Sequence, residues 1–184
     1  MLKKSLSSGR KIVLCTCAAL SAAFLLAACS PTFNWRQVHG SNAPYSVMLP
    51  AKPATYTREV DLDGVKANMT MTAAEVDDTV FAVGSAKMAD AAQATAALQA
   101  MKTALLKNIN GKVKAESTSA QTNSEGTSTD MQIEAIGEVN GKPTLLVARL
   151  SSKDQLIYQI IVIGPEKAIS RENIDMFMSS FKAN

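Results

Sequence analysis

The chain has 184 residues, with 19 basic and 16 acidic side chains, one histidine and three cysteines. Four of the basic residues lie within the first eleven positions, so the remaining charges nearly cancel and give no electrostatic footprint for nucleic acid. A single histidine and so few cysteines exclude most metal-ligand clusters and most thiol-based catalysis.

The N-terminus has the layout of a secretory signal. Its only charges are Lys3, Lys4, Arg10 and Lys11, and an uncharged, largely apolar stretch follows over residues 12–28. A basic start stays on the cytoplasmic side while the apolar stretch enters the bilayer as a helix. The pattern predicts a signal helix in residues 1–28 that is removed from the mature protein. An uncleaved membrane-spanning helix is the alternative, because residues 12–28 lie near the lower end of spanning length.

The end of this segment, Leu26-Ala27-Ala28-Cys29, resembles the lipobox of bacterial lipoprotein precursors. The resemblance implies that the Cys29 thiol takes a diacylglyceryl group and that its freed amine takes a further acyl chain such as palmitate. Two or more chains give a stable anchor, because each buried CH2 contributes only about 0.8 kcal/mol. In such lipoproteins an aspartate after the cysteine retains the protein at the inner membrane. Ser30 therefore implies the periplasmic face of the outer membrane.

Removal of residues 1–28 changes the composition of the protein. The signal carries four basic and no acidic residues, so 15 basic and 16 acidic residues remain and the formal net charge becomes −1. Cys15 and Cys17 leave with the signal and Cys29 becomes a thioether, so we expect no disulfide in the mature chain. The mature chain is long enough for one core. We expect a short tether at residues 29–34 and a single domain over residues 35–184.

The first half of this domain has the pattern of β-strands. Residues 45–50 read as a strand that ends at a proline, and the strands over 55–62 and 65–73 flank the turn dipeptide Asp63-Gly64. Apolar residues occupy every second position from Val65 to Ala73, which indicates one covered face and one wet face. Trp35 is expected to begin the first strand and pack on the core. Contact of Phe33 and Trp35 with lipid headgroups is the alternative.

A helix follows a turn at Asp77-Asp78 and a short apolar strand over residues 80–83. Asp90 is the expected N-cap, and Gly111 is expected to take the left-handed position beyond the last turn. The predicted buried stripe is Ala94, Leu98, Met101, Leu105 and Ile109. Residues 117–129 contain almost no apolar side chain, so they read as an exposed loop or a weakly ordered hairpin.

The last third predicts three neighbouring antiparallel strands and a second helix. Strands over residues 131–139 and 143–150 are joined by Asn140-Gly141, a strong hairpin signal, and a third strand covers 155–162. From about Ser170 the apolar side chains recur at helical spacing, at Ile174, Phe177, Met178 and Phe181. The sequence thus predicts an α+β fold, in which two amphipathic helices cover an antiparallel sheet of six to seven strands.

This element order resembles that of PsbP-like domains, which also occur in bacterial lipoproteins. The resemblance rests on Tyr45-Ser-Val-Met-Leu-Pro50-Ala-Lys-Pro53, on the hairpin, helix and meander of the middle, and on Phe177-Met-Ser-Ser-Phe181. It covers nearly all of the mature chain and concerns structural positions. The resemblance implies a PsbP-like fold and a role as an accessory or assembly factor that acts through protein contacts.

Few residues of the mature chain suggest catalysis or metal binding. His39 is the only histidine, and we interpret it as a surface or strand-edge residue rather than as part of a catalytic triad. The acidic residues Asp61 and Asp63, and Glu75 with Asp77-Asp78, fit solvated turns better than a calcium site. The methionines at 69, 71, 176 and 178 are soft ligands, but we expect them to fill the core. We therefore predict no catalytic, cofactor or metal site.

The sequence then favours a non-enzymatic, membrane-anchored protein. Its predicted contacts are the bilayer, through acyl chains on Cys29, and another protein of the cell envelope. The alternative is a periplasmic carrier that holds a small apolar ligand between sheet and helices. An enzyme would need His39 to meet a serine and a carboxylate from elsewhere in the chain.

Overall fold

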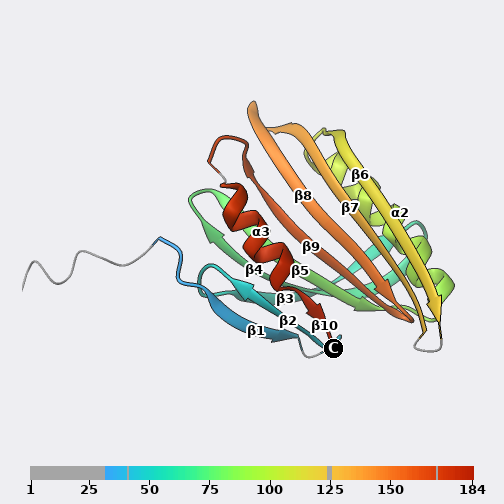
Figure 1. Ribbon diagram of the computed structural model, residues 1–184. Helices are drawn as coiled ribbons and strands as arrows, with labels where there is room; N and C mark the ends of the chain where they lie inside the picture. The colour runs from blue at the N-terminus through green and yellow to red at the C-terminus, as the bar shows by residue number, and fades with distance from the viewer. Residues whose placement is uncertain (1–31, 41, 124–125, 169) are drawn as a thin grey trace, which may run out of the picture. The chain divides into compact units, whose positions relative to one another are not determined.

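The computed structural model describes residues 32–40, 42–123, 126–168 and 170–184. The predicted signal helix, the lipobox with Cys29 and the first half of the predicted tether, residues 29–31, lie outside the described residues. Residues Phe33–Asn184 form one compact unit, to which the following description applies. The unit has an α+β fold, as predicted, with a seven-stranded antiparallel sheet, a small three-stranded sheet and two helices (Figure 1).

Strands dominate the chain order of this unit. Its elements are β1 (Arg36–Gly40), β2 (Tyr45–Leu49), β3 (Ala54–Leu62), β4 (Val65–Val76), β5 (Thr79–Lys87), α2 (Ala91–Asn108), β6 (Lys112–Asn123), β7 (Gly126–Val139), β8 (Lys142–Lys153), β9 (Leu156–Pro165), α3 (Arg171–Ser180) and β10 (Lys182–Ala183). The large sheet has the order β3-β4-β5-β9-β8-β7-β6, and the small one has the order β1-β2-β10.

Tight turns with left-handed residues set the register of the large sheet. Asn140 and Gly141 have φ values of 52° and 75°, and they pair Val139 of β7 with Lys142 of β8. Both positions of such a turn need positive φ, which Asn and Gly adopt at low cost. Asp63-Gly64 and Asp77-Asp78 make equivalent turns at β3–β4 and β4–β5. All three predicted hairpins are therefore confirmed.

One face of the large sheet is covered by α2. The Asp90 side chain caps the helix by accepting the backbone N–H of Gln93 at 2.8 Å, as the sequence predicts. All five residues of the predicted stripe are buried, and α2 packs mainly over β7, β8 and β9. Met69 and Met71 of β4 belong to the same hydrophobic cluster. On the opposite face of β4, Lys66 is exposed to solvent whereas Thr72, farther along the strand, is buried.

The end of α2 differs from the expectation. Asn110, with φ of 50°, takes the left-handed position that we assigned to Gly111. The absence of a side chain at this point serves packing instead. Gly111 lies against Gly137 of β7. A Cβ on Gly137 would collide with the carbonyl oxygen of Ile109. The glycines thus let the chain pass closely over the sheet as it enters β6.

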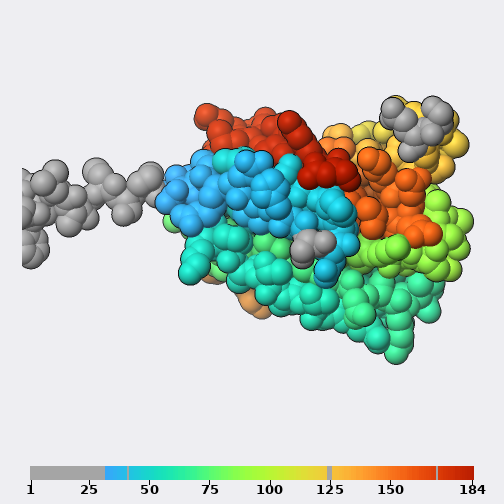
Figure 2. Space-filling model, turned by 90° about the horizontal axis from the view of Figure 1, so that it is seen from below, coloured from blue at the N-terminus to red at the C-terminus, as the bar shows by residue number. Residues whose placement is uncertain are grey.

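The other face of the large sheet is covered by α3 and by the small sheet, which lie side by side (Figures 1 and 2). The sequence predicts α3 and β2 but not the small sheet, because β10 pairs with β2 across almost the whole domain. Phe33 and Trp35 both pack against Phe81 of β5, with ring centroids 6.3 and 6.1 Å away. Trp35 therefore belongs to the core, and β1 begins at the next residue.

Of the two interpretations of residues 117–129, the exposed loop is wrong and the hairpin is correct. This region contains the second half of β6 and the start of β7, which pair residue by residue down to Asn123 and Gly126. All twelve residues of β6 are exposed, because β6 is the last strand of the sheet. A strand with two wet faces needs no apolar side chains, so the pattern that identifies half-buried strands is missing there.

Because two tyrosines are buried, we expect the fold to lose stability at alkaline pH. Burial raises the pKa of Tyr45, which a hydrogen bond with Thr72 partly offsets, and burial together with the charge of Tyr45 raises the pKa of Tyr158. The folded state therefore favours the protonated phenols. Their contribution is fully present below the ordinary tyrosine pKa of about 10, and it is lost as pH rises through the raised values.

We expect the free energy of unfolding of the natural chain to fall between pH 8 and pH 11, as urea titrations followed by Trp35 fluorescence would show. The Tyr45→Phe/Tyr158→Phe variant should lose less stability over the same interval. At pH 8 it should be weaker by about 1 kcal/mol, because Tyr158 Oη no longer donates its 3.1 Å hydrogen bond to the Pro44 carbonyl. Equal slopes with pH in both proteins would contradict the assignment to these phenols.

Candidate functional site

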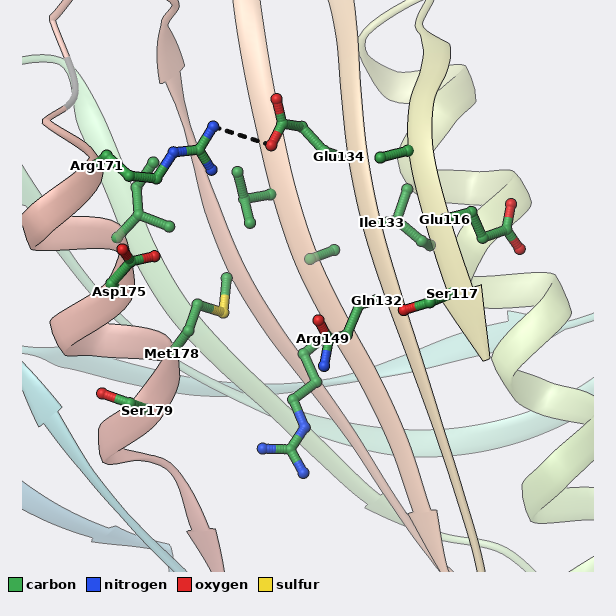
Figure 3. Close-up of a pocket in the computed structure, with 14 residues that line it drawn as sticks. Glu116, Ser117, Gln132, Ile133, Glu134, Arg149, Arg171, Asp175, Met178 and Ser179 are labelled. Atoms are coloured by element: carbon green, nitrogen blue, oxygen red, sulfur yellow. Dashed lines mark hydrogen bonds and ion pairs between the residues drawn. The ribbon is translucent and has the colours of Figure 1, made fainter. Parts of the chain in front are cut away.

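A groove with a volume of about 470 Å³ lies beside α3 on the face of the sheet opposite α2. Its floor consists of residues from β6, β7 and β8, and one wall is the side of α3 (Figure 3). The groove exists because α3 covers the centre of the sheet and leaves the outer strands β7 and β6 open. Residues of the floor that point into it include Ser117, Gln132, Glu134 and Arg149, and the wall includes Arg171, Asp175 and Met178.

Glu134 is the central charge of the groove. Its side chain is 23% exposed and accepts a hydrogen bond from Arg171 Nη2 of α3 at 3.0 Å. Lys114 Nζ of β6 lies 3.6 Å from the other carboxylate oxygen. One carboxylate on β7 thus connects the helix wall to the edge strand. The Arg171 side chain is 58% exposed and uses only Nη2 in this pair, so its other N–H groups can donate to a ligand.

Arg149 lies on the same floor, farther along β8, and it is held more firmly than Arg171. Its Nε donates to Asp130 Oδ1 at 2.7 Å, and its guanidinium carbon lies 5.9 Å from the centroid of the Phe181 ring. The two side chains of this ion pair are 33% and 28% exposed. A charged hydrogen bond and a cation–π contact together fix the side chain at the boundary between the groove and the aromatic core.

The edge strand β6 forms the outer border of the groove. Ala115 and Ser117 belong to the groove side. Glu116, between them, points away toward α2 (Figure 3). There Lys102 Nζ donates to the two carboxylate oxygens of Glu116 at 2.6 and 2.7 Å. This contact ties α2 to β6 on the opposite face of the sheet. The groove itself therefore contains the charges of Glu134, Arg149, Arg171 and Asp175.

The chemistry of this site is that of polar recognition. The residues that line it include cations, carboxylates, an amide and hydroxyl groups next to six apolar residues, but no histidine or cysteine. Within the described ranges, no three histidine, cysteine, aspartate or glutamate side chains lie close enough together to hold a metal ion. The lining suits a ligand that presents hydrogen-bonding groups and charges of both signs.

The residues considered in the sequence lie elsewhere. His39 is exposed on β1, an edge strand, opposite Ser46 of β2. Asp61 and Asp63 lie at the β3–β4 turn, where Asp61 Oδ1 accepts the Gly64 N–H at 2.6 Å, and Asp77 and Asp78 make the next turn. These are the turn and strand-edge positions that we expected.

The methionines only partly follow the expectation of core filling. Met69 and Met71 are buried, and both sulfur atoms lie close to Gly84, in the space that a Cβ there would need. Met176 is exposed on α3, and Met178 lies in the groove (Figure 3). The helical pattern of α3 indicated a buried stripe, but it could not show that the stripe covers only part of the sheet.

Cys29 is outside the described residues, so its modification stays a prediction. In the part of the chain that the structure does describe, neither helix is both long and apolar enough to cross a membrane. The sequence pattern did not indicate the groove at all. Glu134 and Arg171 are 37 residues apart, and no local spacing indicates that they meet.

We expect the two arginines of the groove to differ in their contribution to stability. Arg149→Ala removes a partly buried charged hydrogen bond and the contact with Phe181, so it should lower the free energy of unfolding by about 1–2 kcal/mol. Arg171→Ala removes an exposed ion pair and should cost less than about 0.5 kcal/mol. Urea unfolding of both variants measures the difference, and equal losses would contradict it.

Comparison of the chain with protein-family models gives no match, and comparison with curated proteins gives none of significant similarity. A function is therefore inferred from the N-terminal sequence pattern, the resemblance in element order and the geometry of the groove. Of these three, only the groove consists of side chains whose positions the structure describes.

Proposed function

We propose that this protein is a lipid-anchored accessory protein of the bacterial cell envelope, and that it binds another envelope protein in the groove beside α3. The observation that carries the proposal is the set of partly exposed charges that line the groove, namely Glu134 and Arg149 on its floor and Arg171 on its wall. Arginine is frequent at the centres of protein interfaces, where it forms several directed hydrogen bonds. The role is one of binding rather than catalysis.

A PsbP-like fold for residues 35–184 is part of this proposal. Its support is the element order, in which a hairpin, a helix and a meander lead to a C-terminal helix that packs with the N-terminal strands. Tyr45 and Phe181, at the two ends of the resembling segments, pack together with ring centroids 5.8 Å apart. The quoted motifs thus occupy one aromatic cluster.

The anchor would hold the groove close to the bilayer. Only three residues separate Cys29 from Phe33, where the compact unit begins. Four Cα steps reach at most about 14 Å, so a lipidated Cys29 would restrict the domain to the membrane surface. With Ser30 rather than Asp after the cysteine, we place the protein on the periplasmic face of the outer membrane. A partner would then be met at that surface.

The lining of the groove favours a protein segment over the small apolar ligand of the alternative hypothesis. Its floor places charged groups where an apolar ligand would need apolar walls. On the α2 face the space between helix and sheet is filled by side chains that are at most 2% exposed, among them Ala94, Ala97, Leu98 and Met101.

The anchor is tested by the mass of the protein purified from bacterial membranes. We expect the natural chain to begin at Cys29 and to carry the added mass of acyl groups. Cys29→Ser should remain at the mass of the full precursor, because the modified thiol is required before cleavage. The Cys15→Ser/Cys17→Ser variant is the matched control and should be processed normally. An unmodified natural chain that retains residues 1–28 would instead show an uncleaved membrane-spanning helix.

The binding site is tested by photo-crosslinking in cells. A photoreactive residue at Gln132, which is exposed in the groove, should give one discrete crosslinked product with another protein. The matched control is the same residue at Asn68, exposed on β4 outside the groove, which should give none. Arg171→Glu should reduce the Gln132 product severalfold without unfolding the domain, because this exposed pair contributes little to stability. Equal products at both sites, or none at either, would refute the groove as the binding site.

A further inference from the structure

The border of the groove, β6, has the properties of a strand that pairs with another strand. Every one of its twelve residues is exposed, and it is the last strand in the sheet order. We propose that β6 pairs antiparallel with β6 of a second copy of this chain, with the twofold axis at Ser119. The pairing would join two seven-stranded sheets edge to edge and would leave both grooves open.

The hydrogen bonds around β7 identify which backbone groups of β6 point outward. The N–H of Thr127 donates to Asp154 Oδ1 at 3.2 Å, and its carbonyl accepts the N–H of Asp154 at 2.8 Å. Thr127 therefore directs both groups away from its partner on β6, Thr122. In an antiparallel ladder such pairs alternate with hydrogen-bonded ones. Thr122, Ala120 and Thr118 consequently present their N–H and C=O groups to the outside of the sheet.

The two edges of the sheet differ in their protection against strand pairing. The opposite edge, β3, carries exposed charges at Arg58, Glu59 and Asp61, which discourage an added strand. In β6 the charges are confined to Lys112, Lys114 and Glu116, and residues 117–123 are uncharged. This half of β6 is also straight in its pairing, since the irregularity of the strand lies between Val113 and Ala115. It is the unprotected edge of the large sheet.

Charge and geometry select the register. With the axis at Ser119, Thr118 faces Ala120 of the second copy, and Glu116 faces Thr122. The twofold axis repeats each of these pairs, so four pairs exchange backbone hydrogen bonds. No like charges then lie opposite each other. An axis at Glu116 would oppose two carboxylates, and an axis nearer the start of the strand would use the irregular part. An axis at Ala120 leaves one fewer complete pair among residues 116–122.

The side chains of this half favour a second copy over an unrelated strand. A foreign strand gains specificity from pockets for its alternate side chains. Residues 117–122 provide small hydroxyl, amide and methyl groups, all of them exposed. Such a surface is complementary to itself, because Ser and Thr pair across strands, and a twofold axis closes the assembly at two copies. An interface of this size is small, so the dimer should be weak and concentration-dependent.

The first test uses disulfide formation in the full-length protein, kept in its membranes. Ser119 and its copy would be a directly opposed pair without hydrogen bonds, with Cα atoms about 4.5 Å apart, which a disulfide can bridge. Ser119→Cys should therefore give a crosslinked dimer on oxidation. Gln121→Cys, on the same face, would be displaced from its copy by four residues, or about 13 Å, and should react at least roughly tenfold more slowly. Thr57→Cys on β3 and the natural chain are further controls.

A second test does not depend on cysteine reactivity. Ser119→Lys and Ser119→Glu each place like charges opposite each other at the axis, and each should lower the dimer association constant roughly fivefold in analytical ultracentrifugation of the detergent-solubilised protein. An equimolar mixture of the two variants should restore association. Because Ser119 is exposed, Ser119→Lys should retain the melting curve of the natural chain. Ser119→Glu lies opposite Asp130 of β7 and should melt slightly lower, so Ser119→Lys is the variant that isolates the effect on the dimer.

The outcomes separate this proposal from the groove. A natural chain that remains monomeric at all concentrations, equal crosslinking at Ser119, Gln121 and Thr57, or a Ser119 product with a different protein would each overturn self-pairing. Loss of the dimer in Ser119→Lys with an unchanged Gln132 photo-crosslink would support it and leave the groove as an independent site. Failure of the Gln132 crosslink alone would affect only the proposed function.

Discussion

The fold depends on the burial of β5 and β9 on both faces. Phe81, Val83, Tyr158 and Ile160 point to the α3 side and are essentially inaccessible, while Ala82 and Ile157 point to the α2 side. Neither helix alone could remove these strands from water, because each lies on one face of the sheet. The small sheet completes the cover on the α3 side, where Trp35, Phe81 and Phe177 form edge-to-face contacts. Every other element is arranged around this pair of strands.

The features that sequence could predict are those set by neighbouring residues. Asp63-Gly64, Asn140-Gly141 and the Asp90 cap act within a few positions, and their geometry follows from backbone sterics and local hydrogen bonds. The alternation in β4 and the stripe of α2 were equally informative, since each reports one buried face. These signals established the α+β class, the three meander strands and the second helix.

The features that escaped prediction depend on contacts between distant parts of the chain or on the absence of burial. β10 joins β2 only because Lys182 and Ala183 lie beside Ser46 and Tyr45 in the folded domain, and two residues carry no strand pattern. β6 has no apolar period, since no layer covers it. The groove requires α3 to stop short of β7, and Arg171 to meet Glu134 across the gap. Local composition constrains none of these distances.

The closure of the small sheet has a consequence for the order of folding. The N–H of Met48 donates to Ser180 Oγ, 132 residues later in the chain, and the N–H of Asn184 donates to the carbonyl of Pro44. A chain that emerges N-terminus first can form its hairpins and α2 early. The aromatic cluster on the other face cannot form until Phe177 and Phe181 are present. Until then Tyr45 lacks its contact with Phe181, and Phe81 lacks its contact with Phe177. The segment formed by α3 and β10 thus completes the cover of the sheet. A chain cut or stalled before this segment would expose the apolar side chains of the central strands on that face.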